Sequence, residues 1–249
     1  MRQLILHRPA RRNALTPALA RALGNEIDAA GEAGDVRIVV LRGAGGHFCA
    51  GLDLHWLQSL GETPGIEELQ HGLGDFQSAV LAAVRCPLPV VAVVEGTAAG
   101  FGLDLALACD IRVASAGATF TSAFARVGLV PDGGSTYTLP RLTGPGQALR
   151  LLLAGETFDA GRARAIGLVD EVVEPEALDQ WLGTFLGGVA AAAPGSVRAI
   201  KRLVRAQELG ALEQALAGEG AAQLQALQGD EFRRRLESFT ARATRAGGA

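Results

Sequence analysis

The stretch "LPVVAVVEGTAAGFGLDLALACD" (residues 88–110) decides the fold class of this chain. It opens with a nearly unbroken apolar run, which is typical of a strand buried on both faces of a parallel sheet. A loop of small residues follows, and apolar residues then continue as a helix from about Gly102. One carboxylate, Asp104, lies inside that helix, although burying an unpaired charge is costly. The stretch predicts a strand, a tight loop and a helix, and it makes Asp104 a candidate functional residue.

Strands and helices alternate in this way through the first half of the chain. Further runs rich in β-branched residues predict strands at residues 2–7, 36–43, 110–115 and 118–124. Residues 16–35 carry apolar residues at helical spacing, with Thr16 suited to the N-cap and Pro17 to the first turn. This alternation predicts an α/β fold.

The remaining segments are predicted to be mobile or helical. Residues 60–75 are polar and glycine-rich, which predicts a mobile surface segment. Residues 146–156 and 159–173 are predicted to be helical, and the tail from about residue 176 has a helical pattern. We therefore expect an α/β core over residues 1–190 and a C-terminal helical region over residues 191–249.

The composition excludes several classes of protein. The 249 residues are 49% hydrophobic and 20% charged, which is globular, and a net charge of −3 gives no electrostatic reason to bind nucleic acid or an anionic membrane. Lys201 is the only lysine, so a catalytic lysine is not expected. The three cysteines lack disulfide or metal-ligand spacing, and no segment has the pattern of a signal peptide or membrane span. We expect a reduced, cytoplasmic protein without a metal.

Two loops of small residues are suited to binding an anion through their backbone. The first is "GAGGHFCAGLDL" (residues 43–54), and the second is the loop that precedes the helix containing Asp104. Free N–H groups at two helix starts, after neighbouring strands, can converge on one oxygen as an oxyanion hole. The alternative for the first loop is an ordinary connection in which Asp53 is an N-cap.

A third stretch, "GLVPDGGSTYTLPRLTG" (residues 128–144), places a carboxylate on a turn. Proline, aspartate and two glycines form a strong turn signal, so Asp132 is open to two interpretations. It is either a turn residue or an acid presented to a ligand.

Four ordered motifs resemble the crotonase superfamily, the enoyl-CoA hydratase/isomerase family. They are "HRPARRNAL" (7–15), "HFCAGLDL" (47–54), "GTAAGFGLDLALACDIRVAS" (96–115) and "GLVPDGGSTYTLPRLTG" (128–144). The resemblance covers nearly the whole chain and implies a spiral of ββα units with a C-terminal helical trimerisation region. It also implies an acyl-CoA thioester as substrate, no cofactor other than the coenzyme A of that substrate, and a homotrimer or dimer of trimers.

The resemblance assigns the oxyanion hole to two backbone N–H groups. By motif position they belong to Leu52 and Phe101, and in this family such groups hold the thioester oxygen and stabilise an enolate. Fixed donors lower the energy of a transition state when charge develops where they point. Phe101 stands where glycine is more frequent, and we expect an ordinary φ there because phenylalanine at positive φ is strained.

The resemblance also implies residues that contact the substrate or its CoA. Arginine suits phosphate recognition, and a solvated surface position is the alternative for each arginine. "ESFTAR" (237–242) is similar to the family segment that packs on a neighbouring subunit's CoA. The substrate- and CoA-binding candidates are Arg11, Arg12, Ala14, Ala50, Gly51, Asp53, Leu54, Gly100, Phe124, Phe239 and Arg242.

The candidate acids distinguish the possible reactions. Hydratases of this family use two glutamates, and the matching positions here are Asp104 and Phe124, so the second carboxylate is missing. Asp132 matches the carboxylate of Δ3,Δ2-enoyl-CoA and dienoyl-CoA isomerases, and its surroundings are similar to ring-1,2-epoxyphenylacetyl-CoA isomerases. We predict double-bond or ring isomerisation of an enoyl-CoA, with Asp132 as main acid/base and Asp104 as auxiliary. The alternatives are an enoyl-CoA hydratase that uses Asp104 and a catalytically weak acyl-CoA-binding subunit.

Overall fold

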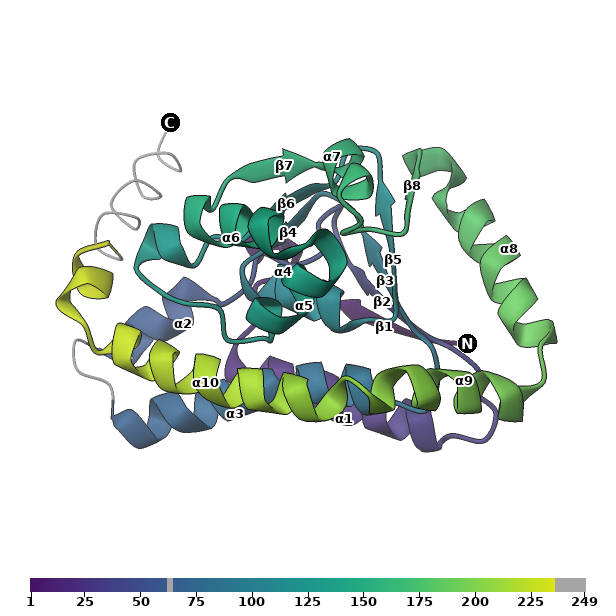
Figure 1. Ribbon diagram of the computed structural model, residues 1–249, viewed down its shortest axis with the longest axis horizontal. Helices are drawn as coiled ribbons and strands as arrows, with labels where there is room; N and C mark the ends of the chain where they lie inside the picture. The colour runs from purple at the N-terminus through teal and green to yellow at the C-terminus, as the bar shows by residue number, and fades with distance from the viewer. Residues whose placement is uncertain (62–64, 236–249) are drawn as a thin grey trace.

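The structure is a computed structural model that describes residues 1–61 and 65–235 (Figure 1). Its main sheet has five parallel strands in the order β1-β2-β3-β5-β8. Their bounds are Arg2–Leu6, Val39–Gly43, Val90–Val94, Ile111–Ser115 and Glu171–Val173. The parallel order confirms the predicted α/β class.

A smaller sheet lies beside the first and contains β4 (Thr97–Ala99), β6 (Thr119–Thr121) and β7 (Thr157–Asp159). Successive turns of the chain add one strand to each sheet and then a helix: β3, β4 and α4 are followed by β5, β6 and α5. Isolated parallel bridges from Leu15 to Leu52 and from Cys49 to Ala98 continue this pattern toward the N-terminus. The repetition confirms the predicted spiral of ββα units.

The helices of the described chain follow these strands. Their bounds are α1 (Pro17–Glu32), α2 (Leu54–Ser59), α3 (Ile66–Arg85), α4 (Phe101–Ala108), α5 (Ser135–Thr143), α6 (Pro145–Ala154), α7 (Ala160–Ala165), α8 (Leu178–Ala191), α9 (Pro194–Ala206) and α10 (Leu209–Leu227). Short 3₁₀ turns are η1 (Pro9–Arg11), η2 (Ala125–Val127) and η3 (Pro175–Ala177).

Strand β3 is buried on both faces, as its unbroken apolar run predicted. Its alternate residues point to opposite sides of the sheet. Val90, Ala92 and Val94 belong to the main core, whereas Val91 and Val93 belong to a second cluster with apolar side chains of α8. All five residues are fully buried, so this strand fixes the centre of the molecule.

The prediction of a mobile segment over residues 60–75 is wrong from residue 66 onward, because α3 begins there. The apolar side chains of Leu69, Leu73 and Phe76 continue a buried helical stripe that the intervening glycines obscured. Gly72 does not interrupt the helix but lets it approach α1, since a Cβ there would lie 3.2 Å from Pro17 Cγ. Residues 62–64 lie outside the described part.

The helical prediction for residues 159–173 is wrong at both ends. Asp159 closes the short strand β7, which pairs antiparallel to β6 and brings Phe158 within 5.8 Å of the ring centroid of Phe120. Residues 171–173 form β8, which pairs with β5 at the edge of the main sheet. Strands of three residues are too short to show a period, so tertiary pairing decides them. Of the strand predicted at residues 118–124, only Thr119–Thr121 forms a strand, which is β6.

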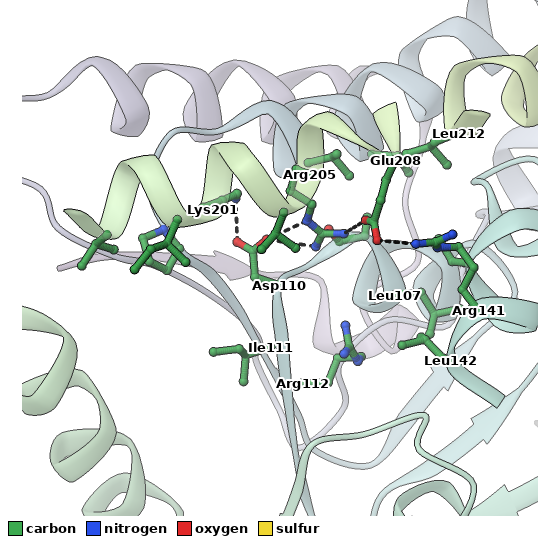
Figure 2. Close-up of a pocket in the computed structure, with 18 of the residues that line it drawn as sticks. Leu107, Asp110, Ile111, Arg112, Arg141, Leu142, Lys201, Arg205, Glu208 and Leu212 are labelled. Carbon is green, nitrogen blue, oxygen red and sulfur yellow. Dashed lines mark hydrogen bonds and ion pairs between the residues drawn. The ribbon is translucent and has the colours of Figure 1, made fainter. Parts of the chain in front are cut away.

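Helix α9 is anchored to the core by a network of charges in which Lys201 is buried and Asp110 and Arg205 are partly buried (Figure 2). On α9, the ammonium of Lys201 lies 2.6 Å from Asp110 and donates to the carbonyls of Ala83 and Leu88. Arg205 bonds the other oxygen of Asp110 at 2.9 Å. The network continues through Glu208 to Arg141 on α5. It lines a pocket of about 570 Å³ between the core and the α8–α9 segment.

The predicted division at residue 190 falls at the end of α8. Helices α9 and α10 follow it, and α10 packs against α3 and α5 (Figure 1). The division into core and C-terminal region stays a prediction. Within residues 1–61 and 65–235, no helix is both long and apolar enough to cross a membrane.

Replacing Lys201 with methionine tests this anchoring. The change leaves two buried carbonyls without a donor and removes a buried positive charge, which costs about 3 kcal/mol. The control is Arg85→Met, which removes the exposed ion pair between Arg85 on α3 and Glu213 on α10 and costs less than about 1 kcal/mol. Urea unfolding measures both free energies. Equal losses for the two variants would contradict a buried anchor at Lys201.

Candidate active site

The two predicted oxyanion loops lie side by side. Cys49 pairs with β4 through hydrogen bonds from its N–H to the Thr97 carbonyl and from the Ala99 N–H to its own carbonyl, each 3.0 Å. On the other side, Leu15 accepts from Asp53 and donates to Gly51, each at 2.8 Å. The spiral therefore brings residues 49–53 against the end of β4 and the start of α4.

Glycines allow this close approach. Gly51 has φ +93°, and a Cβ there would lie 2.6 Å from the carbonyl oxygen of Ala99 and 3.2 Å from the nitrogen of Phe101. A Cβ on Gly102 would lie 2.2 Å from the carbonyl oxygen of Cys49. No side chain fits at either position, so both glycines are needed to bring the two loops into contact.

The N–H groups of Leu52 and Phe101 have no acceptor within the described part of the chain. Phe101 is the first residue of α4, where backbone N–H groups are unpaired and the helix dipole favours negative charge. Gly100, with φ 52° and ψ −127°, makes the sharp turn before it. Phe101 itself is absent from the residues with positive φ, so the expected ordinary φ is confirmed.

A pocket of about 210 Å³ opens beside these two loops. Among the predicted site residues, it is lined by Ala50, Leu52, Leu54, Gly100, Phe101, Phe124 and Asp132. The pocket is otherwise mostly apolar, and the rings of Phe76 and Phe101 pack edge to face 4.5 Å apart. Sequence reasoning missed Phe76 because it assigned the preceding residues to a mobile segment, and it also missed Gln223.

Asp132 is the carboxylate that lines this pocket among the described residues. Its side chain is 7% exposed, and Oδ2 accepts a hydrogen bond of 3.2 Å from Gln223. Oδ1 is buried without a partner. Burial raises the pKa of Asp132 to about 7, helped by the negative charge of Glu219, while the bond from Gln223 acts in the opposite direction. A carboxyl group with this pKa can accept and return a proton at neutral pH.

Asp104 lies behind the turn that carries Asp132 and does not line the pocket. Its Oδ2 accepts from the N–H of Gly133 at 3.1 Å, and a Cβ on Gly133 would lie 2.5 Å from the Asp104 Cβ. Burial raises the pKa of Asp104 well above its usual range, and the nearby charges of Glu219 and Asp132 raise it further. The structure therefore brings Asp104 and Asp132 together, but of these two acids only Asp132 lines the pocket.

Two polar residues of α10 hold the same turn. Gln223 donates to Asp132, and Glu219 accepts from the N–H groups of Gly134 and Thr136 at 2.6 and 2.8 Å. The sequence contained a signal for both, because they continue the buried face of Leu212 and Leu216 at helical spacing. Polar residues on such a face require specific partners.

Asp53 has the N-cap role that was the alternative interpretation of its loop. Its Oδ1 accepts from the N–H groups of His55 and Trp56 at the start of α2, and its Oδ2 lies 2.7 Å from Arg8. Partial burial raises the pKa of Asp53, but the hydrogen bond and charge of Arg8 outweigh it, so the net shift is downward. Asp53 does not line the pocket, and a substrate contact for it stays a prediction.

The candidates in the first motif lie next to the first of the two predicted oxyanion loops. The carbonyl of Arg12 accepts from Ala50 at 2.9 Å, and Asn13 fixes the loop by donating to the carbonyls of Ala44 and His47. Both Arg11 and Arg12 are exposed, whereas Ala14 is buried. Phe239 and Arg242 lie outside the described residues.

Comparison with known proteins agrees with this architecture. The family model described as enoyl-CoA hydratase/isomerase matches residues 2–245. A probable enoyl-CoA hydratase of Rhodobacter capsulatus is 33% identical over 236 residues, covering 95% of this chain and 90% of the relative. The peroxisomal Delta(3,5)-Delta(2,4)-dienoyl-CoA isomerase of Arabidopsis thaliana is 33% identical over 223 residues, covering 86% and 80%.

The fold comparison points to the same class. The crystal structure of enoyl-CoA hydratase from Bacillus halodurans has a TM-score of 0.90 and 28% sequence identity, and the match covers 95% of each chain. The ββα spiral and its paired glycine loops are thus those of the crotonase class of α/β proteins. The chain belongs to the enoyl-CoA hydratase/isomerase family, whose members act on acyl-CoA thioesters.

Replacing Gly102 with alanine tests the loop contact. The added Cβ pushes the start of α4 away from Cys49 and separates the two free N–H groups, so kcat for an enoyl-CoA falls by about 10²-fold. The control is Gly74→Ala in α3, where a Cβ meets nothing within 4 Å and helix stability rises by about 0.5 kcal/mol. Steady-state kinetics measures both variants. Full activity in Gly102→Ala would show that the contact does not serve catalysis.

Proposed function

We propose that the protein isomerises an enoyl-CoA by moving a double bond within the acyl group. The observation that carries this proposal is the position of Asp132, which lines the same apolar pocket as Leu52 and Phe101. Asp104, by contrast, is covered by Gly133. The reaction then needs one group that both removes and returns a proton.

The proposed reaction is a 1,3-proton shift. Asp132 removes a proton from C2 of a 3-enoyl thioester, and the electron pair of the C–H bond moves into the thioester to form a dienolate. The N–H groups of Leu52 and Phe101 bind the negative oxygen, which gains charge in the transition state. Protonated Asp132 then returns a proton to C4, the double bond moves to C2–C3, and the carboxylate is restored.

The character of the pocket supports isomerisation over hydration. Three aromatic side chains, Phe76, Phe101 and Phe124, line it, and an apolar wall disfavours a bound water. Phe124 stands where a hydratase of this family carries its second glutamate. The pKa of about 7 for Asp132 suits a group that alternates between base and acid.

Hydration is the second candidate, because several relatives and several structural neighbours are named as enoyl-CoA hydratases or related acyl-CoA hydratases. It requires Asp104 to activate water from behind Gly133. Isomerisation is favoured because the acid that lines the pocket is Asp132. Relatives named as isomerases also occur, among them the dienoyl-CoA isomerase described above.

We also propose that Arg11 and Arg12 contact the phosphates of CoA. Both side chains are exposed, and neither has an ion-pair partner among the described residues. Their loop is joined to the oxyanion loop through the hydrogen bond between Arg12 and Ala50. Guanidinium groups at this edge are free to bind the phosphates of a thioester whose carbonyl lies inside the pocket.

Replacing Asp132 with asparagine tests the proposed reaction. The amide cannot carry the proton, so isomerisation of a 3-enoyl-CoA falls by about 10³-fold, and exchange of the C2 proton in D₂O falls with it. Asp104→Asn is the matched control and retains most of the exchange. Rapid hydration of crotonyl-CoA that depends on Asp104 would support a hydratase instead. Acyl-CoA binding without exchange in the unmodified protein would indicate a binding subunit.

A further inference from the structure

Helix α10 places two buried polar residues one turn apart on the face that meets the core. Glu219 is 5% exposed and Gln223 is 1% exposed, and both continue the apolar row of Leu212 and Leu216. Burying a carboxylate and an amide on such a face is costly unless each is hydrogen-bonded. Both residues satisfy this requirement through the turn that carries Asp132.

The contacts of Gln223 fix the orientation of its amide. The N–H of Val130 donates to Oε1 at 3.0 Å, and a backbone N–H can only donate. The other end of the amide, Nε2, must therefore face Asp132, where it donates to Oδ2 at 3.2 Å. Reversing the amide would lose both bonds.

This orientation makes the two oxygens of Asp132 unequal. Oδ2 is occupied as an acceptor, whereas Oδ1 is buried with no partner in the described part of the chain. When Asp132 is neutral, its proton belongs on Oδ1, because a proton on Oδ2 would compete with the amide N–H.

Glu219 holds the other side of the same turn. Its carboxylate accepts from Gly134 and Thr136, while Gln223 holds Val130. The turn with Asp132 at its centre is thus fastened before and after that residue by a single helix, α10.

We infer that Gln223 is a positioning residue, which reserves Oδ2 of Asp132 as an acceptor and leaves Oδ1 as the oxygen that carries the transferred proton. This inference rests on the proposed role of Asp132 as the acid/base. It extends that role by giving helix α10 of the same chain a part in positioning the acid/base.

The charges and dipoles around Asp132 determine the direction in which each substitution shifts its pKa. In the described part of the chain, the charged groups facing Asp132 are Glu219 from α10 and Asp104 from α4. The Gln223 amide stabilises the ionised form of Asp132, so its removal raises the pKa of that carboxyl. The charge of Glu219 destabilises the same form, so its removal lowers the pKa.

The test is the pH profile of kcat/KM for a 3-enoyl-CoA in Gln223→Met and Glu219→Gln. In Gln223→Met the midpoint of the acidic limb rises by about one pH unit. Activity that is lost at neutral pH therefore returns at higher pH. In Glu219→Gln the same limb moves down. Gln225→Met is the control, because Gln225 is exposed on the same helix, and its profile matches the unmodified protein.

A purely structural role for Gln223 would lower activity equally at every pH, and that result would overturn the inference. If Gln223→Met does not fold, Gln223→Glu decides the question. It keeps an acceptor for Val130 but places a second carboxylate against Asp132, so the limb moves up further. An unshifted limb in Gln223→Glu overturns the inference as well. Failure of the proposed function is distinguishable, because the unmodified protein would then not isomerise a 3-enoyl-CoA, or Asp132→Asn would isomerise it as fast as the unmodified protein.

Discussion

The candidate site depends on one close contact between two backbone segments. The carbonyl of Cys49 and the start of α4 approach so closely that Gly102 has no room for a side chain, and Gly51 is equally confined against Ala99. This contact joins the two loops at one candidate site, because it brings Leu52 and Phe101 to the lining of the same pocket. The parallel bridge between Cys49 and Ala98 holds the contact in register.

The second constraint is the burial of carboxylates around one turn. Asp104, Asp132 and Glu219 are all buried, and their mutual repulsion is tolerated because α10 and the backbone N–H groups of the turn supply hydrogen bonds. A raised pKa means that the folded state disfavours ionised Asp132. Its charge therefore weakens folding increasingly as the pH rises from about 4 to about 7, and by a constant amount above that. Burial of Asp132 thus lowers the free energy of unfolding at neutral pH, and the same burial gives a carboxyl group that exchanges protons near that pH.

The sequence predicted the parts of the fold that have strong local signals. The unbroken apolar run at β3 and the alternation of strands and helices predicted the α/β class. The ordered motifs pointed to Leu52, Phe101 and Asp132, which line one pocket. It failed where glycines hid the periodicity of α3, and where the strands β7 and β8 are too short to show any. The roles of Gln223 and the shielding of Asp104 by Gly133 depend on contacts between residues 91 and 29 positions apart. Local patterns carry little information about such contacts.

In the proposed complex, the thioester oxygen and the transferred proton lie in one apolar pocket, where the N–H groups of Leu52 and Phe101 hold the oxygen and Asp132 holds the proton. A crystal structure with a bound, unreactive acyl-CoA measures this directly. We expect a thioester oxygen within about 3 Å of the nitrogens of both Leu52 and Phe101. We also expect Asp132 to be the carboxylate nearest C2 and C4. A thioester bound elsewhere, or a water held by Asp104 next to C3 of the acyl group, would contradict this arrangement.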